Sequence, residues 1–242
     1  MRRGEYGYDA PYALMIFGSL ALVFGLVAAI AWWRSSMRAA VPFVIDSVIL
    51  LAMAGSFFYT TRRGKFIEWE GILDGLHLRG DEMVLDMGCG RGAVLTAVAR
   101  RLTSGRVTGV DIWSKHDQSG NAMEVTLQNA SLEGVSQRAH IETADMRALP
   151  FADATFDVVV SSLAIHNIRS NADRRTAVRE AFRVVKPGGG IVIADIRATA
   201  LYADTLRVLG ASSVERRRLG WRFWWGNPIA ATTLVKASKA LA

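Results

Sequence analysis

Val84-Leu85-Asp86-Met87-Gly88-Cys89-Gly90-Arg91-Gly92 is the stretch that decides the fold of this 242-residue chain. It begins within a short apolar run, 83–86, which predicts a buried strand, and it ends in a turn with three glycines. Glycines let the backbone approach a ligand closely, because no Cβ intervenes. The turn alone is a weak signal, and its Gly-x-Gly-x-Gly spacing differs from the Gly-x-Gly-x-x-Gly of dinucleotide-binding turns.

Around this turn the sequence alternates between strand and helix patterns. The predicted strands cover 83–86, 107–110, 140–142, 156–161 and 191–195, and the helices 65–78, 93–102, 119–133, 174–185 and 201–209. Two more strands, 213–224 and 232–237, follow with no helix between them. This order predicts an α/β, Rossmann-like fold with a seven-stranded, mostly parallel sheet and an antiparallel edge.

Three acidic residues follow the first three predicted strands: Asp86, Asp111 and Asp145. Ligands bind at the carboxyl ends of the strands in such a sheet, so these acids mark the expected site. A carboxylate at Asp111 suits the paired hydroxyls of a ribose. A nicotinamide cofactor would use the same acid, so these residues alone leave NAD open.

Four stretches together resemble the class I methyltransferases that depend on S-adenosylmethionine (SAM), in the branch that acts on small molecules and quinones. They are Val84 to Gly92, Val107 to Ile112, Ala144 to Ser161 and Ala181 to Gly189. The resemblance covers about residues 65–237. It implies SAM as the cofactor and methyl transfer as the activity.

The resemblance also implies positions for the SAM-binding residues. The methionine part would meet Asp86, Gly88, Cys89, Gly90 and Ser161. The ribose would be held by Asp111, and the adenine by Ile112, Trp113, Asp145 and Met146. The alternative for Asp86 and Asp145 is a role in forming turns or caps.

His166 is the candidate general base, in case the methyl acceptor must lose a proton. His116, in the loop after the second strand, is the second candidate, and a purely structural role is the alternative for either histidine. The polar segment 113–121 is expected to cover the cofactor or the acceptor. No metal site is predicted.

Two long apolar runs precede the α/β part of the chain. Residues 12–33 carry no charge, and residues 41–60 carry only Asp46. At about 1.5 Å per residue, either run can cross a bilayer core of about 30 Å. The sequence therefore predicts a transmembrane hairpin over 1–63 and a methyltransferase domain over 64–242. A signal peptide is the alternative for the first run, but that run ends in Trp32-Trp33 rather than in a small-residue cleavage site.

Basic residues flank the hairpin mainly on the side of its two ends, with Arg2 and Arg3 before it and Arg62, Arg63 and Lys65 after it. This bias predicts an integral membrane protein with both termini and the catalytic domain in the cytoplasm. The single cysteine, Cys89, excludes an internal disulfide.

The segment 216–225 is basic and aromatic. A membrane-facing patch is the favoured interpretation, and nucleic-acid binding and an edge strand packed on the sheet are the alternatives. Nucleic acid is not the expected partner, because Ser161-Ser162-Leu163-Ala164 stands where amino-group methyltransferases carry Asn/Asp-Pro-Pro-aromatic.

These patterns predict a membrane-anchored, SAM-dependent methyltransferase whose acceptor is small and lipophilic. Membrane lipids are the expected partners, and a homo-oligomer is compatible with the hairpin. The alternative is a SAM-binding membrane protein that acts as a sensor or scaffold without turnover.

Overall fold

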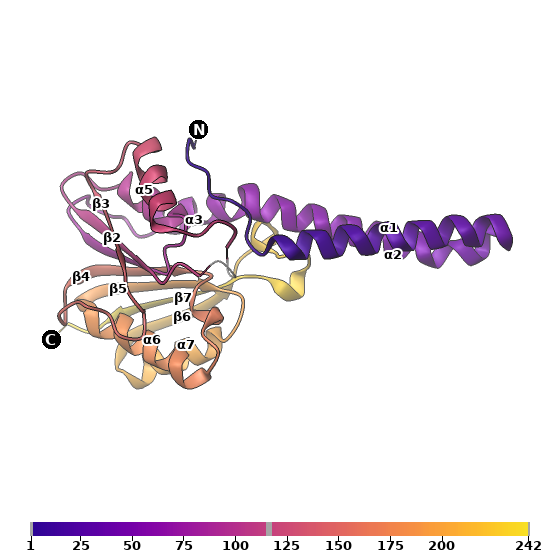
Figure 1. Ribbon diagram of the computed structural model, residues 1–242. Helices are drawn as coiled ribbons and strands as arrows, with labels where there is room; N and C mark the ends of the chain where they lie inside the picture. The colour runs from indigo at the N-terminus through magenta and orange to yellow at the C-terminus, as the bar shows by residue number, and fades with distance from the viewer. Residues whose placement is uncertain (1, 115–117, 242) are drawn as a thin grey trace.

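A pair of long helices projects from a sheet domain in the computed structural model, which describes residues 2–114 and 118–241 (Figure 1). These helices are α1 (Pro11–Arg34) and α2 (Met37–Tyr59), and only two residues, 35–36, connect them. The sequence predicted a connection over 34–40 and a second span over 41–60. The second helix begins earlier because the Ser36 side chain caps it, accepting a hydrogen bond from the Ala39 N–H at 3.4 Å.

Small side chains form the contact between α1 and α2. Ala21, Ala28 and Ala40 are buried, and the Ser47 hydroxyl donates to the Ala21 carbonyl at 2.8 Å. Most apolar side chains on the outer faces of this hairpin are exposed. Both helices are long and apolar enough to cross a membrane, by length and composition.

The second helix does not end where it meets the sheet domain. It continues through a π-helical turn, η1 (Thr60–Gly64), into α3 (Lys65–Asp74). The boundary expected between residues 63 and 64 therefore falls inside one helix of 38 residues, Met37–Asp74. Because α3 packs on α4, the hairpin is joined to the sheet domain by a continuous helix.

The sheet has seven strands in the order β3-β2-β1-β4-β5-β7-β6. The strands are β1 (Met83–Met87), β2 (Arg106–Asp111), β3 (Ala139–Thr143), β4 (Phe156–Ser162), β5 (Val185–Asp195), β6 (Ala211–Arg218) and β7 (Thr233–Lys239). The first five are parallel, and β7 and β6 add an antiparallel edge. The predicted seven-stranded, mostly parallel sheet is confirmed.

Helices cover both faces of this sheet and form two apolar cores. On one face lie α3, α4 (Ala93–Ala99) and α5 (Met123–Leu132), and on the other α6 (Asn171–Val184) and α7 (Thr199–Val208) (Figure 1). The sequence predicted α5 to begin at residue 119, but Gln118 and Ser119 instead bond to the N-terminal segment.

The segment predicted as a strand over 213–224 ends at Arg218. Residues 219–232, here called the collar, leave the sheet and fold against the base of the hairpin. The Phe57 and Trp225 rings lie 5.1 Å apart, and so do the Tyr59 and Trp221 rings. The strand stops because these aromatic side chains gain more contact against the hairpin than an edge strand would give them.

Gly64 lies where the continuous helix crosses the collar. A Cβ added there would stand 1.8 Å from the Arg222 carbonyl oxygen. We expect Gly64→Ala to lower the free energy of unfolding by about 1–3 kcal/mol, because the collar must move away. Gly71→Ala, on α3 with no atom within 4 Å of the added Cβ, is the matched control and should be neutral or slightly stabilising. Equal melting temperatures in detergent for the two variants would contradict this packing.

Candidate functional site

A pocket of about 830 Å³ opens at the carboxyl ends of β1, β2 and β4. The glycine turn after β1 forms its floor, with Gly88 and Gly90 at positive φ angles of 74° and 50°. A Cβ on Gly88 would stand 2.2 Å from the Ala164 Cβ. Glycine is therefore required at this position, because both the backbone conformation and the close approach of the β4 loop exclude a side chain.

Asp86 ends β1 as a buried acid in this pocket. Neither of its carboxylate oxygens has a hydrogen-bond partner among the described residues. Burial, and then the nearby charge of Asp111, raise the pKa of Asp86 to about 7. The ionised form of this carboxylate would be stabilised by a cationic group from a ligand, and the ammonium of SAM would fit there.

Asp111, at the end of β2, ties the glycine turn to the second strand. Its carboxylate accepts from the Gly90 N–H at 2.9 Å, the Trp113 N–H at 2.7 Å and the Asn121 side-chain amide at 3.3 Å. Since a carboxylate offers about four acceptor sites and three are used, about one remains for a ligand hydroxyl on the pocket side.

The pKa of Asp86 predicts how SAM affinity depends on pH. Because the ionised carboxylate attracts the cationic ligand, affinity should rise about five- to ten-fold between pH 6 and pH 7.5. Without ligand, the free energy of unfolding changes with pH in the opposite direction. The folded chain keeps a proton up to about pH 7 that the unfolded chain releases near pH 4, so stability falls across that interval. Isothermal titration calorimetry measures the affinity, and Asp86→Asn should remove the rise; an unchanged rise in that variant would assign it to another group.

Most of the predicted site residues line this one pocket: Asp86, Gly88, Cys89, Gly90, Asp111, Ile112, Asp145, Met146 and His166. Trp113 and Ser161 are placed outside the lining. The Trp113 indole N–H donates to the Thr143 hydroxyl at 2.7 Å, and the buried Ser161 hydroxyl donates to the Met87 carbonyl at 2.8 Å. Both side chains therefore have partners within the protein, and the neighbouring Ser162 lines the pocket; the contacts predicted between SAM and Trp113 or Ser161 stay predictions.

Cys89 is the one predicted residue whose chemistry the structure limits. Its side chain is buried under the turn, and burial raises the pKa of the thiol well above its ordinary value. The thiol therefore stays protonated and acts as a small apolar group.

Asp145, expected at the adenine, is held by its neighbour Arg147 at 2.6 Å. This hydrogen-bonded ion pair lowers the pKa of Asp145, which stays ionised. Arg147 also lies 3.6 Å from Asp173 at the start of α6. The pairs fix the loop after β3 beside Met146 at the pocket rim.

His166 has a partner that the sequence did not indicate. Its Nδ1 lies 2.6 Å from Oδ1 of Asp195, a fully buried acid at the end of β5. The His166 backbone N–H donates to Asp195 Oδ2 at 3.0 Å, and the Tyr202 hydroxyl donates to the same oxygen at 3.2 Å. Burial and Asp195 raise the pKa of Tyr202 well above its ordinary value, so this hydroxyl remains a donor.

The pocket extends to the base of the hairpin, where aromatic side chains form its wall. Its lining includes Tyr12, Phe57, Phe66, Trp69 and Trp225. The Trp69 indole N–H donates to the Ser162 hydroxyl at 2.8 Å and so fixes the wall to β4. The helical spacing of Phe66 and Trp69 was visible in the sequence, but nothing local connects it with the glycine turn.

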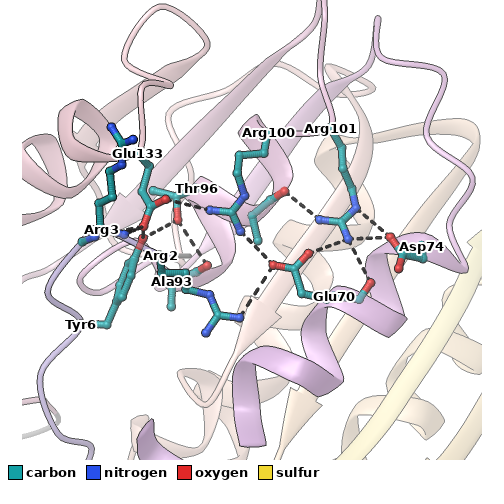
Figure 2. A network of polar contacts seen from close by, with 12 residues as sticks. Arg2, Arg3, Tyr6, Glu70, Asp74, Ala93, Thr96, Arg100, Arg101 and Glu133 are labelled. Atoms are coloured by element: carbon teal, nitrogen blue, oxygen red, sulfur yellow. Dashed lines mark hydrogen bonds and ion pairs between the residues drawn. The ribbon is translucent and has the colours of Figure 1, made fainter. Parts of the chain in front are cut away.

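Residues 2–10, here called the N-terminal strap, run from the start of α1 across the helices beside the glycine turn. The Tyr6 hydroxyl bonds to Thr96 at 2.8 Å and donates to Glu133 at 3.0 Å, as Figure 2 shows. Asp9, in the pocket lining, contacts Lys65 and accepts from Thr61 at 2.8 Å and from Gln118 at 3.1 Å. The strap therefore connects the first apolar helix with the wall of the pocket.

The same part of the molecule carries an ion-pair network (Figure 2). Glu70 on α3 lies 2.8 Å from Arg100 and 2.7 Å from Arg101, which follow α4. Arg100 also lies 3.3 Å from Glu133 after α5. This network holds α3, the continuation of the hairpin, against the helices behind the glycine turn.

The segment 113–121, predicted to cover the site, is described only in part. Residues 115–117, which include the candidate base His116, lie outside the described residues. On either side of them Ser114, Gln118 and Asn121 line the pocket. The Gln118 side chain accepts from the Arg91 N–H at 3.1 Å, directly over the glycine turn.

Comparison with known proteins agrees with this geometry. Residues 85–193 match the family model described as a methyltransferase domain. Methyltransferase GfsG of Streptomyces halstedii is 35% identical over 127 residues, 52% of this chain and 42% of its own length. Sterol 4-C-methyltransferase strm-1 of Caenorhabditis elegans is 29% identical over 167 residues, 66% of this chain and 47% of its own length. The chain thus spans less than half the length of these relatives.

Solved structures share the fold. The structure of a SAM-dependent methyltransferase from Methanosarcina mazei superposes with a TM-score of 0.57 and 20% identity, covering 70% of this chain and 98% of that one. The hairpin lies outside the matched family segment. The match over residues 85–193 supports a methyltransferase domain in this chain, with SAM as the methyl donor that its site would bind.

Proposed function

We propose that this chain is a membrane-anchored, SAM-dependent methyltransferase that transfers a methyl group to a small, lipophilic acceptor. One observation carries the proposal: a single pocket runs from the glycine turn to the aromatic wall at the base of the apolar hairpin. Its inner end is acidic, with Asp86 and Asp111. Its outer end carries the aromatic side chains of Phe57, Phe66 and Trp225, beside the paired charges of Asp9 and Lys65.

The division of the pocket suggests where each reactant lies. When bound, SAM supplies an electrophilic methyl group on a positively charged sulfur. Asp86, Asp111 and Asp145 would hold the ammonium, ribose and adenine groups, respectively. The acceptor would lie between the glycine turn and the aromatic wall, where Trp69 and Phe57 exclude water. His166, backed by Asp195, would take a proton from an acceptor that must lose one.

The wall explains why a lipophilic acceptor is favoured. Tyr12 and Phe57 belong to the two apolar helices themselves, so the outer end of the pocket lies where the hairpin meets the domain. An acceptor dissolved in a bilayer would reach this end without crossing water. The sterol substrate in the name of one relative is of this chemical kind.

We also infer that the hairpin spans the membrane with both of its ends on the cytoplasmic side. The apolar, exposed faces of α1 and α2 support the spanning, and the flanking basic residues support the sidedness. Alkaline carbonate extraction of membranes tests the anchoring. A chain released into the soluble fraction would contradict it. A cysteine added to the 35–36 loop that cannot be labelled from outside the cell would contradict the orientation.

Methyl transfer is tested with the full chain in lipid nanodiscs and SAM carrying a labelled methyl group. Extracted membrane lipids are the first acceptor pool, and water-soluble amines, thiols and phenols are the second. Label in the lipid pool supports the proposal, and label in the soluble pool alone contradicts the lipophilic acceptor. Calorimetric binding of SAM with no labelled product from either pool would favour the sensor or scaffold alternative.

A further inference from the structure

A second pocket, of about 350 Å³, lies outside the methyltransferase site, between the start of α7 and the outer end of β6. Three arginines line it: Arg197, Arg216 and Arg218. Within residues 2–114 and 118–241, none of the three forms an ion pair or donates a side-chain hydrogen bond to another residue. Three positive charges therefore converge on a concave surface without an internal counter-charge.

The edge strand explains why two of these arginines point the same way. Side chains two residues apart on a strand lie on one face, so Arg216 and Arg218 share the face that α7 covers. Arg217 lies on the other face, 3.7 Å from Glu215. Among the described residues, β6 is the edge strand of the sheet and pairs with β7 alone, so no further strand covers this side of the pocket.

The collar places this pocket beside the apolar hairpin. A Cβ on Gly226 would stand 3.1 Å from the Phe17 ring and 3.4 Å from the Met53 carbonyl, so the collar reaches the apolar part of both helices. Figure 1 shows this yellow segment beside the base of the two helices. Ile229, on the collar, is 91% exposed and also lines the arginine pocket.

Such an arrangement matches the interface of a membrane. An isoleucine with 91% of its surface in water is unfavourable, whereas the same side chain beside a spanning hairpin can enter the apolar edge of the bilayer. Trp221, stacked on Tyr59 and 56% exposed, lies on the same collar and suits the headgroup level. The arginines beside Ile229 then lie at the depth of lipid phosphates.

We propose that Arg197, Arg216 and Arg218 bind the phosphate group of an anionic membrane lipid. Arginine recognises phosphate through paired N–H donors, and the charge complementarity favours an anionic lipid over a zwitterionic one. The proposal rests on the proposed membrane anchoring. Arg197 also lines the methyltransferase pocket, so the bound lipid would adjoin that site.

Lipid retention by the purified full chain tests the site. The protein in detergent is mixed with equal amounts of phosphatidylglycerol and phosphatidylcholine, and bound lipid is counted by native mass spectrometry. We expect the wild type to retain phosphatidylglycerol preferentially. Arg216→Gln with Arg218→Gln should reduce that retention about ten- to thirty-fold, because each basic residue near an anionic lipid contributes substantially to binding.

The matched control is Arg106→Gln with Arg179→Gln, an equal loss of charge at exposed positions on β2 and α6 away from the collar. It should retain phosphatidylglycerol as the wild type does. Equal retention by both double variants, or no preference by the wild type, would overturn the site. Displacement of the lipid by about 10 mM inorganic phosphate would also overturn it, in favour of a soluble anion. The readout needs no methyl transfer, and extraction by carbonate tests anchoring separately.

Discussion

Replacing His166 by alanine is expected to lower kcat for methyl transfer by about two to three orders of magnitude. His166 lines the pocket, and its Nδ1 lies 2.6 Å from the buried carboxylate of Asp195. If the ring takes a proton from the acceptor, the adjacent carboxylate would stabilise the resulting positive charge. The electron pair left on the acceptor would form the new bond to the methyl carbon while the carbon–sulfur bond breaks and its electron pair goes to the sulfur, which becomes neutral.

The same geometry predicts what His166→Ala should leave unchanged. The Kd for SAM, measured by calorimetry, should stay within about two-fold, since the SAM-binding acids lie on other strands. Added imidazole should restore part of the lost rate, because it can enter the space left by the ring. Loss of rate without such rescue, together with a lowered melting temperature, would assign His166 a structural role.

Asp195→Asn distinguishes the contribution of the proposed base, His166, from that of Asp195, which positions it. The amide keeps an acceptor for the Tyr202 hydroxyl and the His166 N–H but no longer stabilises a charged imidazole. We expect kcat to fall less than in His166→Ala, with no rescue by imidazole. A rate equal to that of the wild type would show that the contact between the two side chains plays no part in methyl transfer.

The sequence was sufficient to predict the residues at the ends of the first two strands and in the turn between them. The glycine turn, Asp86 and Asp111 follow from local patterns, because a strand, a tight turn and the next strand end always meet at one edge of a parallel sheet. The mostly parallel sheet with its antiparallel edge follows from the order of strands and helices along the chain. Ser161 and Ser162 lie on opposite faces of β4; the Ser161 hydroxyl donates to the Met87 carbonyl and Ser162 lines the pocket, so the predicted contact of Ser161 with the methionine part of SAM stays a prediction.

The remainder of the site depends on contacts between distant segments, which no local pattern reveals. Phe57 and Trp225 are far apart in the chain, yet their rings meet at 5.1 Å above the pocket. The collar lost its predicted strand because those rings pack on the hairpin. The contacts of the N-terminal strap could not be predicted either. The sequence around Tyr6 and Asp9 gives no sign that these residues contact Thr96 and Lys65.

This arrangement has a consequence for the role of the hairpin. If α1 and α2 served only as a tether, a flexible linker would suffice between the membrane and the domain. Instead α2 continues into α3 without a break, and Tyr12 and Phe57 line the pocket. The hairpin is part of the wall of the site, so we infer that it shapes the acceptor end as well as locating the enzyme.

Asp111→Asn is expected to raise the Kd for SAM about 100-fold. The carboxylate would accept a hydrogen bond from a ribose hydroxyl at its remaining acceptor site, and a bond to a charged acceptor contributes about 1.5–3 kcal/mol. The amide preserves the size of the side chain and one acceptor for the Gly90 N–H, which lies 2.9 Å from the carboxylate. The turn therefore stays in place while the charge is lost. Calorimetry measures the Kd, and an unchanged melting temperature confirms the fold.

Asp204→Asn is the matched control, because that carboxylate is exposed and pairs with Arg207 at 2.8 Å on the surface of α7. Its Kd for SAM should equal that of the wild type. The pH dependence of SAM affinity in Asp111→Asn distinguishes a lost ribose contact from a displaced glycine turn. The charge of Asp111 helps to raise the pKa of Asp86, so Asp111→Asn should move the rise in SAM affinity to lower pH. If SAM binds weakly but its affinity still rises near pH 7, the two carboxylates are not coupled. If the Kd stays within three-fold of the wild type, Asp111 does not hold the ribose.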